Sequence, residues 1–150
     1  MEKRLKMLKS KASLVCLMFS IGCQTLVTYK EHPKYDLPFA ESAQVDRWIL
    51  LSGQIGIDDT KEKPQLVSGG IREETKQIMR VIGLSLQRQN CTMDNIVKCT
   101  IMMKDMKDWQ QMNEEYLKFF PNHKPLRSAF GTSGLAFGAA VEIECLAYKP

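Results

Sequence analysis

An arginine and a glutamate near the C-terminal end of the chain are the residues best suited to chemistry. Arg127 follows Pro125 in a short apolar segment, and Glu142 lies in a final segment in which apolar and polar residues alternate. Such alternation is typical of a half-buried strand. We expect the two segments to be adjacent strands of one sheet, with a guanidinium that binds an anion beside an acid/base carboxylate. This pairing suits hydrolysis of a small substrate that carries a carboxylate.

The same pair has a purely structural alternative. From the residues alone, an ion pair between Arg127 and Glu142 across two strands is a commoner arrangement than catalysis. Glu144 shares the expected face of Glu142, and we interpret it as a solvated or interface carboxylate. The functional reading therefore needs support from the rest of the sequence.

Periodic segments earlier in the chain must position these side chains. Ser42–Val45 and the apolar run Trp48–Ser52 are expected to form a hairpin. Apolar residues recur at helical spacing between Ile71 and Leu86, which predicts an amphipathic helix with one buried face. A further strand is expected from Asn95 to Met103.

A second helix is predicted to begin near Asp108. Gln111 lies three residues further on, which predicts a capping box, and Pro121 ends the helix. The order is then strands, helix, strand, helix and two strands. It predicts an α+β fold in which a single sheet has two helices packed on one face. The uncovered face of such a sheet favours oligomerisation.

The N-terminal 22 residues differ from the rest of the chain. A basic segment up to Lys11 precedes a short apolar segment, 12–22, and then Cys23. This pattern predicts a lipoprotein signal peptide at 1–22 and a mature domain at 23–150, although Ser20 stands where such signals usually have leucine. The chain would then be exported and anchored by lipidated Cys23 on the periplasmic side of a bacterial membrane. The alternative is an apolar helix packed on a cytoplasmic domain, with Cys23 an ordinary thiol.

The charge of the chain argues against binding to nucleic acid. The net charge is +4, but residues 1–22 contain five cations and one anion, which leaves 16 basic and 16 acidic residues in the remainder. Binding to phosphates requires clustered Lys and Arg. We therefore expect no nucleic-acid partner, and a membrane contact only through the lipid anchor.

The cysteines and histidines show no spacing typical of a metal site. Cys91, Cys99 and Cys145 are an odd set without paired spacing, so we expect no disulfide framework. Cys99 and Cys145 fall in expected strands, where a buried free thiol is the usual state. His32 and His123 have no ligand-type neighbours, and we expect no metal.

Several stretches together identify a family. In order along the chain, they resemble the Rid (YjgF-type) reactive-intermediate imine/enamine deaminases. The resemblance implies a fold like trimeric chorismate mutase and a homotrimer with three clefts between subunits. It further implies hydrolysis of small 2-imino acids to 2-keto acids and ammonia, without metal or cofactor. The matching stretches are 37–43 (LPFAESA), 51–56 (LSGQIG), 108–120 (DWQQMNEEYLKFF), 125–128 (PLRS) and 141–147 (VEIECLA).

The resemblance assigns roles to individual positions. Arg127 matches the arginine that binds the substrate carboxylate, and Glu142 matches the residue that activates water. Asn113 matches a helix asparagine near the site, while Ser52 and Gly53 match a segment that lines the cleft.

Two positions depart from the family pattern. Phe39 stands where many members have a tyrosine that contacts substrate, and Ala129 stands where some have a reactive cysteine. Phe39 and the export signal add weight to an alternative function. In that alternative, the chain is a non-catalytic trimer that binds small carboxylates or a protein.

Overall fold

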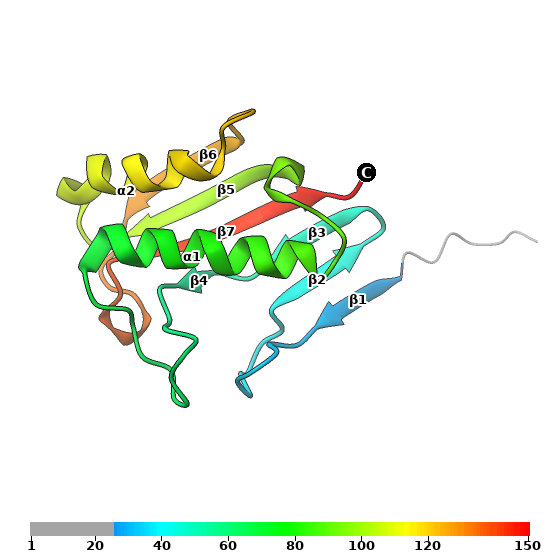
Figure 1. The fold of residues 1–150 in the computed structure, drawn as a ribbon, viewed down its shortest axis with the longest axis horizontal. Helices are drawn as coiled ribbons and strands as arrows, with labels where there is room; N and C mark the ends of the chain where they lie inside the picture. The colour runs from blue at the N-terminus through cyan, green and yellow to red at the C-terminus, as the bar shows by residue number, and fades with distance from the viewer. Residues whose placement is uncertain (1–25) are drawn as a thin grey trace, which may run out of the picture.

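The computed structural model of the chain describes residues 26–150 (Figure 1). The predicted signal peptide and Cys23 lie outside the described residues. The strands are β1 (Val27–Lys30), β2 (Ser42–Val45), β3 (Trp48–Leu51), β4 (Gln54–Ile55), β5 (Ile96–Met103), β6 (Leu126–Gly131) and β7 (Val141–Tyr148). The helices are α1 (Gly70–Gln87) and α2 (Trp109–Tyr116), with 3₁₀ turns at Met93–Asn95, Met106–Asp108, Leu117–Phe119 and Ala136–Gly138.

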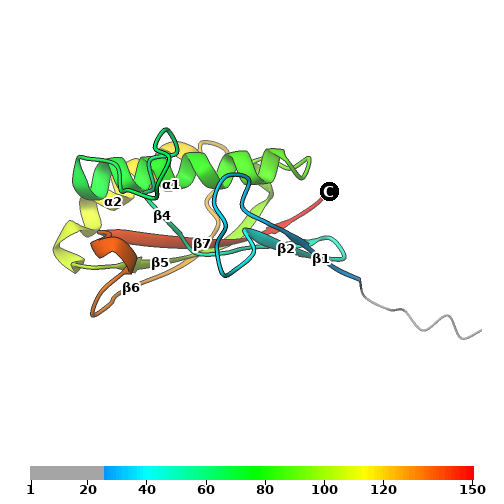
Figure 2. The same ribbon diagram turned by 90° about the horizontal axis from the view of Figure 1, so that it is seen from below.

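The strands form one mixed sheet in the order β1-β2-β3-β7-β5-β6, and the short β4 pairs with β7. β5 and β6 are parallel, and the other neighbours are antiparallel. Both helices lie on the same face of this sheet, as the edge-on view in Figure 2 shows. The predicted α+β fold, a sheet with two helices on one face, is confirmed.

The core lies between the helices and the sheet. Ile78, Ile82 and Leu86 are almost completely buried on one side of α1, as the helical spacing predicts. They pack against sheet residues such as Ile101 and Ile143, which are fully buried. Burial of each such side chain stabilises the fold by about 1.5–3 kcal/mol. No helix among residues 26–150 is long and apolar enough to cross a membrane.

The other face of the sheet has no helix over it and carries exposed apolar side chains. Leu50 is 45% exposed, Leu126 68% and Phe130 48%. Exposed apolar side chains on a sheet face without a helix agree with the expectation that copies of the chain pack together through this face.

The predicted capping box at the start of α2 is wrong. The chain enters α2 through a 3₁₀ turn, so the backbone of Asp108 (φ −86°, ψ 3°) is not extended as a capping residue requires, and its side chain makes no capping bond. Asp105 performs this task one turn earlier, where its carboxylate accepts from the backbone N–H of Lys107.

The expectation of free thiols at Cys99 and Cys145 is also wrong. The two residues lie directly opposite each other on β5 and β7 and are joined by a disulfide, with their Cα atoms 4.1 Å apart. They are 46 residues apart in sequence, so only the register of two strands reveals the pairing. Cys91 is the free cysteine among residues 26–150, and it is buried.

Candidate active site

Arg127 and Glu142 do not meet within one protomer. β5 lies between β6 and β7, so the expectation of adjacent strands is wrong. Arg127 is in register with Cys99, whose partner Cys145 faces the helices. Glu142 is three residues from Cys145 and therefore points to the opposite face of the sheet. Among residues 26–150 no ion pair joins the two, which also removes the structural alternative.

Arg127 is held by three residues of α2. Its guanidinium donates a hydrogen bond to Asn113 Oδ1 and lies over the rings of Trp109 and Tyr116, 5.0 and 5.4 Å from their centroids. These residues share one side of the helix because they are spaced by four and three positions. The aromatic contacts orient the guanidinium without neutralising it.

The space beside Arg127 suits an anion. We call it the arginine pocket; its volume is about 320 Å³, and it is lined by Asn113, Tyr116, Leu117, Lys124, Pro125 and Arg127. The lining contains two cations and no carboxylate. Burial raises the pKa of Tyr116 to about 12, so this phenol is neutral at physiological pH. A substrate carboxylate would therefore meet no competing anion here.

Glu142 lies in a different and larger space, the glutamate cavity, of about 450 Å³. Gly53 lies against the side chain of Glu142, since a Cβ added at Gly53 would lie 2.1 Å from Glu142 Oε1. Burial, with a smaller contribution from Glu144, raises the pKa of the Glu142 carboxyl above its usual value. Such a carboxyl retains a proton more readily and suits a group that accepts and returns protons.

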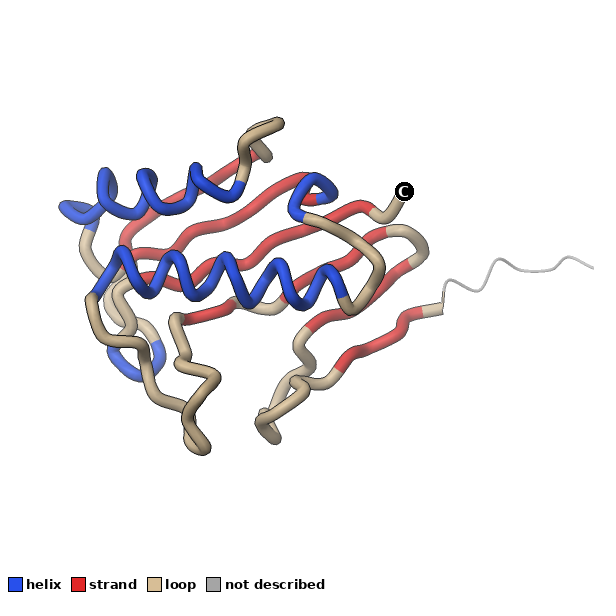
Figure 3. The backbone as a smooth tube through the Cα atoms, in the orientation of Figure 1, coloured by secondary structure: helices blue, strands red, loops and turns tan. Residues whose placement is uncertain are grey.

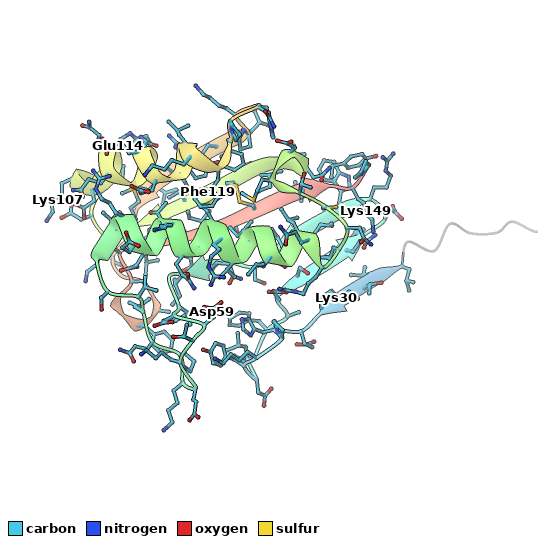
Figure 4. All side chains as sticks on the ribbon, in the orientation of Figure 1. Lys30, Asp59, Lys107, Glu114, Phe119 and Lys149 are labelled. Carbon is cyan, nitrogen blue, oxygen red and sulfur yellow. A yellow bond between two sulfur atoms is a disulfide. The ribbon has the colours of Figure 1, made fainter. Side chains whose placement is uncertain are left out.

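Two loops, residues 31–41 and 56–69, form the mouth of the glutamate cavity. They project together from one edge of the domain, below α1 in Figures 1 and 3. Lys34 Nζ donates to the carbonyl of Asp59 (2.6 Å), and the Tyr35 hydroxyl donates to the carbonyl of Lys61 (2.9 Å). Figure 4 labels Asp59 on this side of the domain. The bonds between the loops hold the cavity walls in place.

Of the remaining predicted site residues, some line the glutamate cavity and others do not. Phe39 lines the glutamate cavity. Ser52 does not; its hydroxyl donates to the carbonyl of Ala40 at 2.7 Å and so positions the loop that carries Phe39. Ala129 is half-buried on β6 and packs against the core.

Some residues of the site were not predicted from the sequence. Trp109 and Tyr116 both contact the guanidinium of Arg127, although no motif in the sequence assigned them to the site. Their spacing of four and three positions from Asn113 places all three on one side of a helix, and this could have predicted the shared contact. Phe137 lines the glutamate cavity from a loop in which its φ is +57°. Only the neighbouring Gly138 hinted at an unusual turn there.

The two spaces together offer an anion site, an acid/base carboxyl and an apolar cavity. Within residues 26–150 no three His, Cys, Asp or Glu side chains gather as a metal site would require. Arg127 can bind a carboxylate and Glu142 can transfer a proton.

Comparison with known proteins gives a consistent result. The sequence profile of the family described as endoribonuclease L-PSP matches residues 30–149. Mouse 2-iminobutanoate/2-iminopropanoate deaminase is 40% identical over 75% of this chain and 82% of its own length, and the human protein of that name is 39% identical over 75% and 80%. A Rid-family protein of unknown function from Yersinia pestis superposes with a TM-score of 0.74 at 31% identity, over 82% of this chain and 99% of that one.

Proposed function

The chain belongs to the endoribonuclease L-PSP (Rid) family and is an enzyme of the 2-iminobutanoate/2-iminopropanoate deaminase class, and we propose that it hydrolyses 2-imino acids or their enamine tautomers to 2-keto acids and ammonia. The observation that supports this most is a pair of complementary spaces. One holds an arginine without a competing anion, and the other holds a carboxyl with a raised pKa.

The active site is assembled between two subunits of a homotrimer. Within one protomer Arg127 and Glu142 occupy different spaces on opposite faces of the sheet. In the assembly, the arginine pocket of one subunit faces the glutamate cavity of the next. The exposed apolar residues Leu50, Leu126 and Phe130 support packing of copies through the open sheet face.

Arg127 binds the substrate carboxylate through two parallel N–H···O bonds. Its contact with Asn113 and the aromatic rings fixes the plane of the guanidinium in advance, so little conformational entropy is lost on binding. This anchors the substrate with its C=N carbon turned toward Glu142.

Glu142 carries the protons. It accepts one proton from a water whose oxygen bonds to the imine carbon, and it passes this proton to the nitrogen. The resulting carbon bears a hydroxyl and an amine. Glu142 then transfers the hydroxyl proton to the amine nitrogen, and the C=O bond forms as the C–N bond breaks and ammonia leaves. A pKa raised by burial suits this shuttle, because the carboxyl must both take and return protons.

We also propose that the chain is exported, with residues 1–22 removed and Cys23 lipidated. The Cys99–Cys145 disulfide supports this location, because such bonds persist in oxidising compartments and are rare in the cytosol. Intact mass spectrometry of membrane fractions tests it. We expect a chain that begins at Cys23 with added acyl mass; an unprocessed chain with three free thiols among Cys91, Cys99 and Cys145 would indicate the cytoplasmic alternative.

Ammonia release from freshly generated 2-iminopropanoate tests the activity itself. We expect turnover by the purified protein and its loss in both Arg127→Ala and Glu142→Ala. A folded oligomer without turnover would instead favour the alternative function, a non-catalytic trimer that binds small carboxylates or a protein.

A further inference from the structure

The glutamate cavity is much larger than the smallest imino acids require. Its volume of about 450 Å³ lies within the range of roughly 300–1,000 Å³ typical of small-molecule sites. The side chain of 2-iminopropanoate is a single methyl group, close in size to a water molecule, which occupies about 30 Å³ in the liquid. Within a single protomer, such a substrate would leave most of the cavity unfilled.

Most polar side chains of this cavity already make bonds within the protein. The side chain of Glu142 makes no hydrogen bond among residues 26–150, so it is available to a substrate. Each of the other four polar lining side chains makes at least one such bond. His32 Nδ1 accepts from the N–H of Tyr35, the Tyr35 hydroxyl donates to Lys61, Gln54 Nε2 donates to the carbonyl of Ser52, and Asp59 accepts from Arg80.

The walls of the cavity are apolar and come from separate parts of the chain. Phe39 lies on the first loop, Ile55 on β4, Val81 on α1 and Phe137 on the 3₁₀ turn before β7. Phe39 and Phe137 are 49% and 67% exposed, so they keep apolar surface for a ligand to cover.

We infer that the substrates of this site are 2-imino acids with a bulky apolar side chain, branched aliphatic or aromatic, and that Phe39, Val81 and Phe137 determine this preference. The inference rests on the proposed function, because Arg127 and Glu142 must hold the carboxylate and the imine carbon. The side chain then extends from the imine carbon into the apolar cavity. Each additional methylene group buried there improves binding about fourfold.

The preference can be measured with three imino acids that an amino-acid oxidase generates from alanine, leucine and phenylalanine. The rate of imine loss gives kcat/KM for each. We expect values for the leucine- and phenylalanine-derived imines at least about tenfold above that for the alanine-derived imine. Similar or higher values for the alanine-derived imine would overturn the inference and leave the deaminase function intact. No turnover of any of the three would contradict the function, and the inference with it.

Two matched substitutions on α1 test whether the cavity causes the preference. Val81 lines the cavity, whereas Leu84 lies one helical turn further on, is 37% exposed and does not line it. Val81→Phe should fill part of the cavity and lower kcat/KM for the two bulky imines about tenfold, with a smaller effect on the alanine-derived imine. Leu84→Phe should leave all three values unchanged. Equal effects of the two substitutions, or a uniform loss in Val81→Phe, would show that the cavity does not select the side chain.

Discussion

The arginine pocket and the glutamate cavity are built in opposite ways. The pocket is formed by regular structure, since Arg127 lies on a strand and its partners Trp109, Asn113 and Tyr116 lie on one side of α2. The cavity is formed mostly by loops and short elements and is apolar apart from a few engaged polar groups. One region orients a charge, and the other partly buries a carboxyl and so raises its pKa.

The difference has a chemical reason. A carboxyl that shuttles protons needs a raised pKa, and a nearby guanidinium would lower it. In the protomer the two groups are kept apart, so burial and Glu144 dominate the pKa of Glu142. In the proposed assembly, the carboxylate of the bound substrate lies between Arg127 and Glu142 and offsets the charge of Arg127.

Loss of the carboxyl in the glutamate cavity should have the largest effect. We expect Glu142→Gln to lower kcat about 10²–10⁴-fold, the usual contribution of a general acid/base group. In the wild-type protein, Glu142 must be ionised to accept a proton from water. Since burial raises its pKa and the bound carboxylate offsets the charge of Arg127, kcat should fall on acidification at a pH above the ordinary carboxyl range. A pH–rate profile checks this, and Glu142→Gln should lose that acid limb; an identical limb in the variant would assign it to another group.

Loss of the charge in the arginine pocket should come next. Arg127→Ala removes the bidentate contact to the substrate carboxylate and should lower kcat/KM about 10²–10³-fold. Arg127→Lys keeps the charge without the fork, so its loss should be intermediate. Steady-state kinetics on one imino acid measures both. If Arg127→Lys and Arg127→Ala were both as active as the wild type, the arginine pocket would not be the carboxylate site.

A smaller effect is expected where Gly53 meets Glu142. A methyl group at position 53 would overlap Glu142 Oε1, which is the movable end of a side chain. Gly53→Ala should therefore displace the carboxylate and lower kcat about tenfold, with little change in the melting temperature. Gly134→Ala is the control, because a Cβ there meets nothing within 4 Å. Loss of stability without loss of kcat would mean that the backbone moves instead of Glu142.

The disulfide concerns stability more than chemistry. It joins β5 to β7 and closes a 46-residue separation, for which chain entropy gives about 4 kcal/mol. The double variant Cys99→Ala/Cys145→Ala should lose roughly 2–4 kcal/mol in urea unfolding, whereas kcat at 25 °C changes little. Cys91→Ala, a buried cysteine without a partner, controls for lost volume. Equal losses in both variants would show that the bond contributes nothing.

The sequence was most informative where local periodicity determines structure. The helix between Ile71 and Leu86 and the final alternating strand were predictable, because burial of one face leaves its period in the sequence. The pairing of Cys99 with Cys145 was not, since it depends on the register of strands far apart in the chain. The separation of Arg127 from Glu142 was missed for the same reason: β5 enters the sheet between two strands that follow it in sequence.

Mixing of inactive subunits tests most directly that each site is shared between two copies of the chain. Arg127→Ala and Glu142→Ala proteins are unfolded together, refolded together and assayed for imine hydrolysis. A trimer assembled at random has an intact arginine pocket facing an intact glutamate cavity at roughly one interface in four. We therefore predict recovery of about a quarter of wild-type activity from two inactive parents. No recovery in a mixture shown by mass to contain mixed trimers would contradict the shared site.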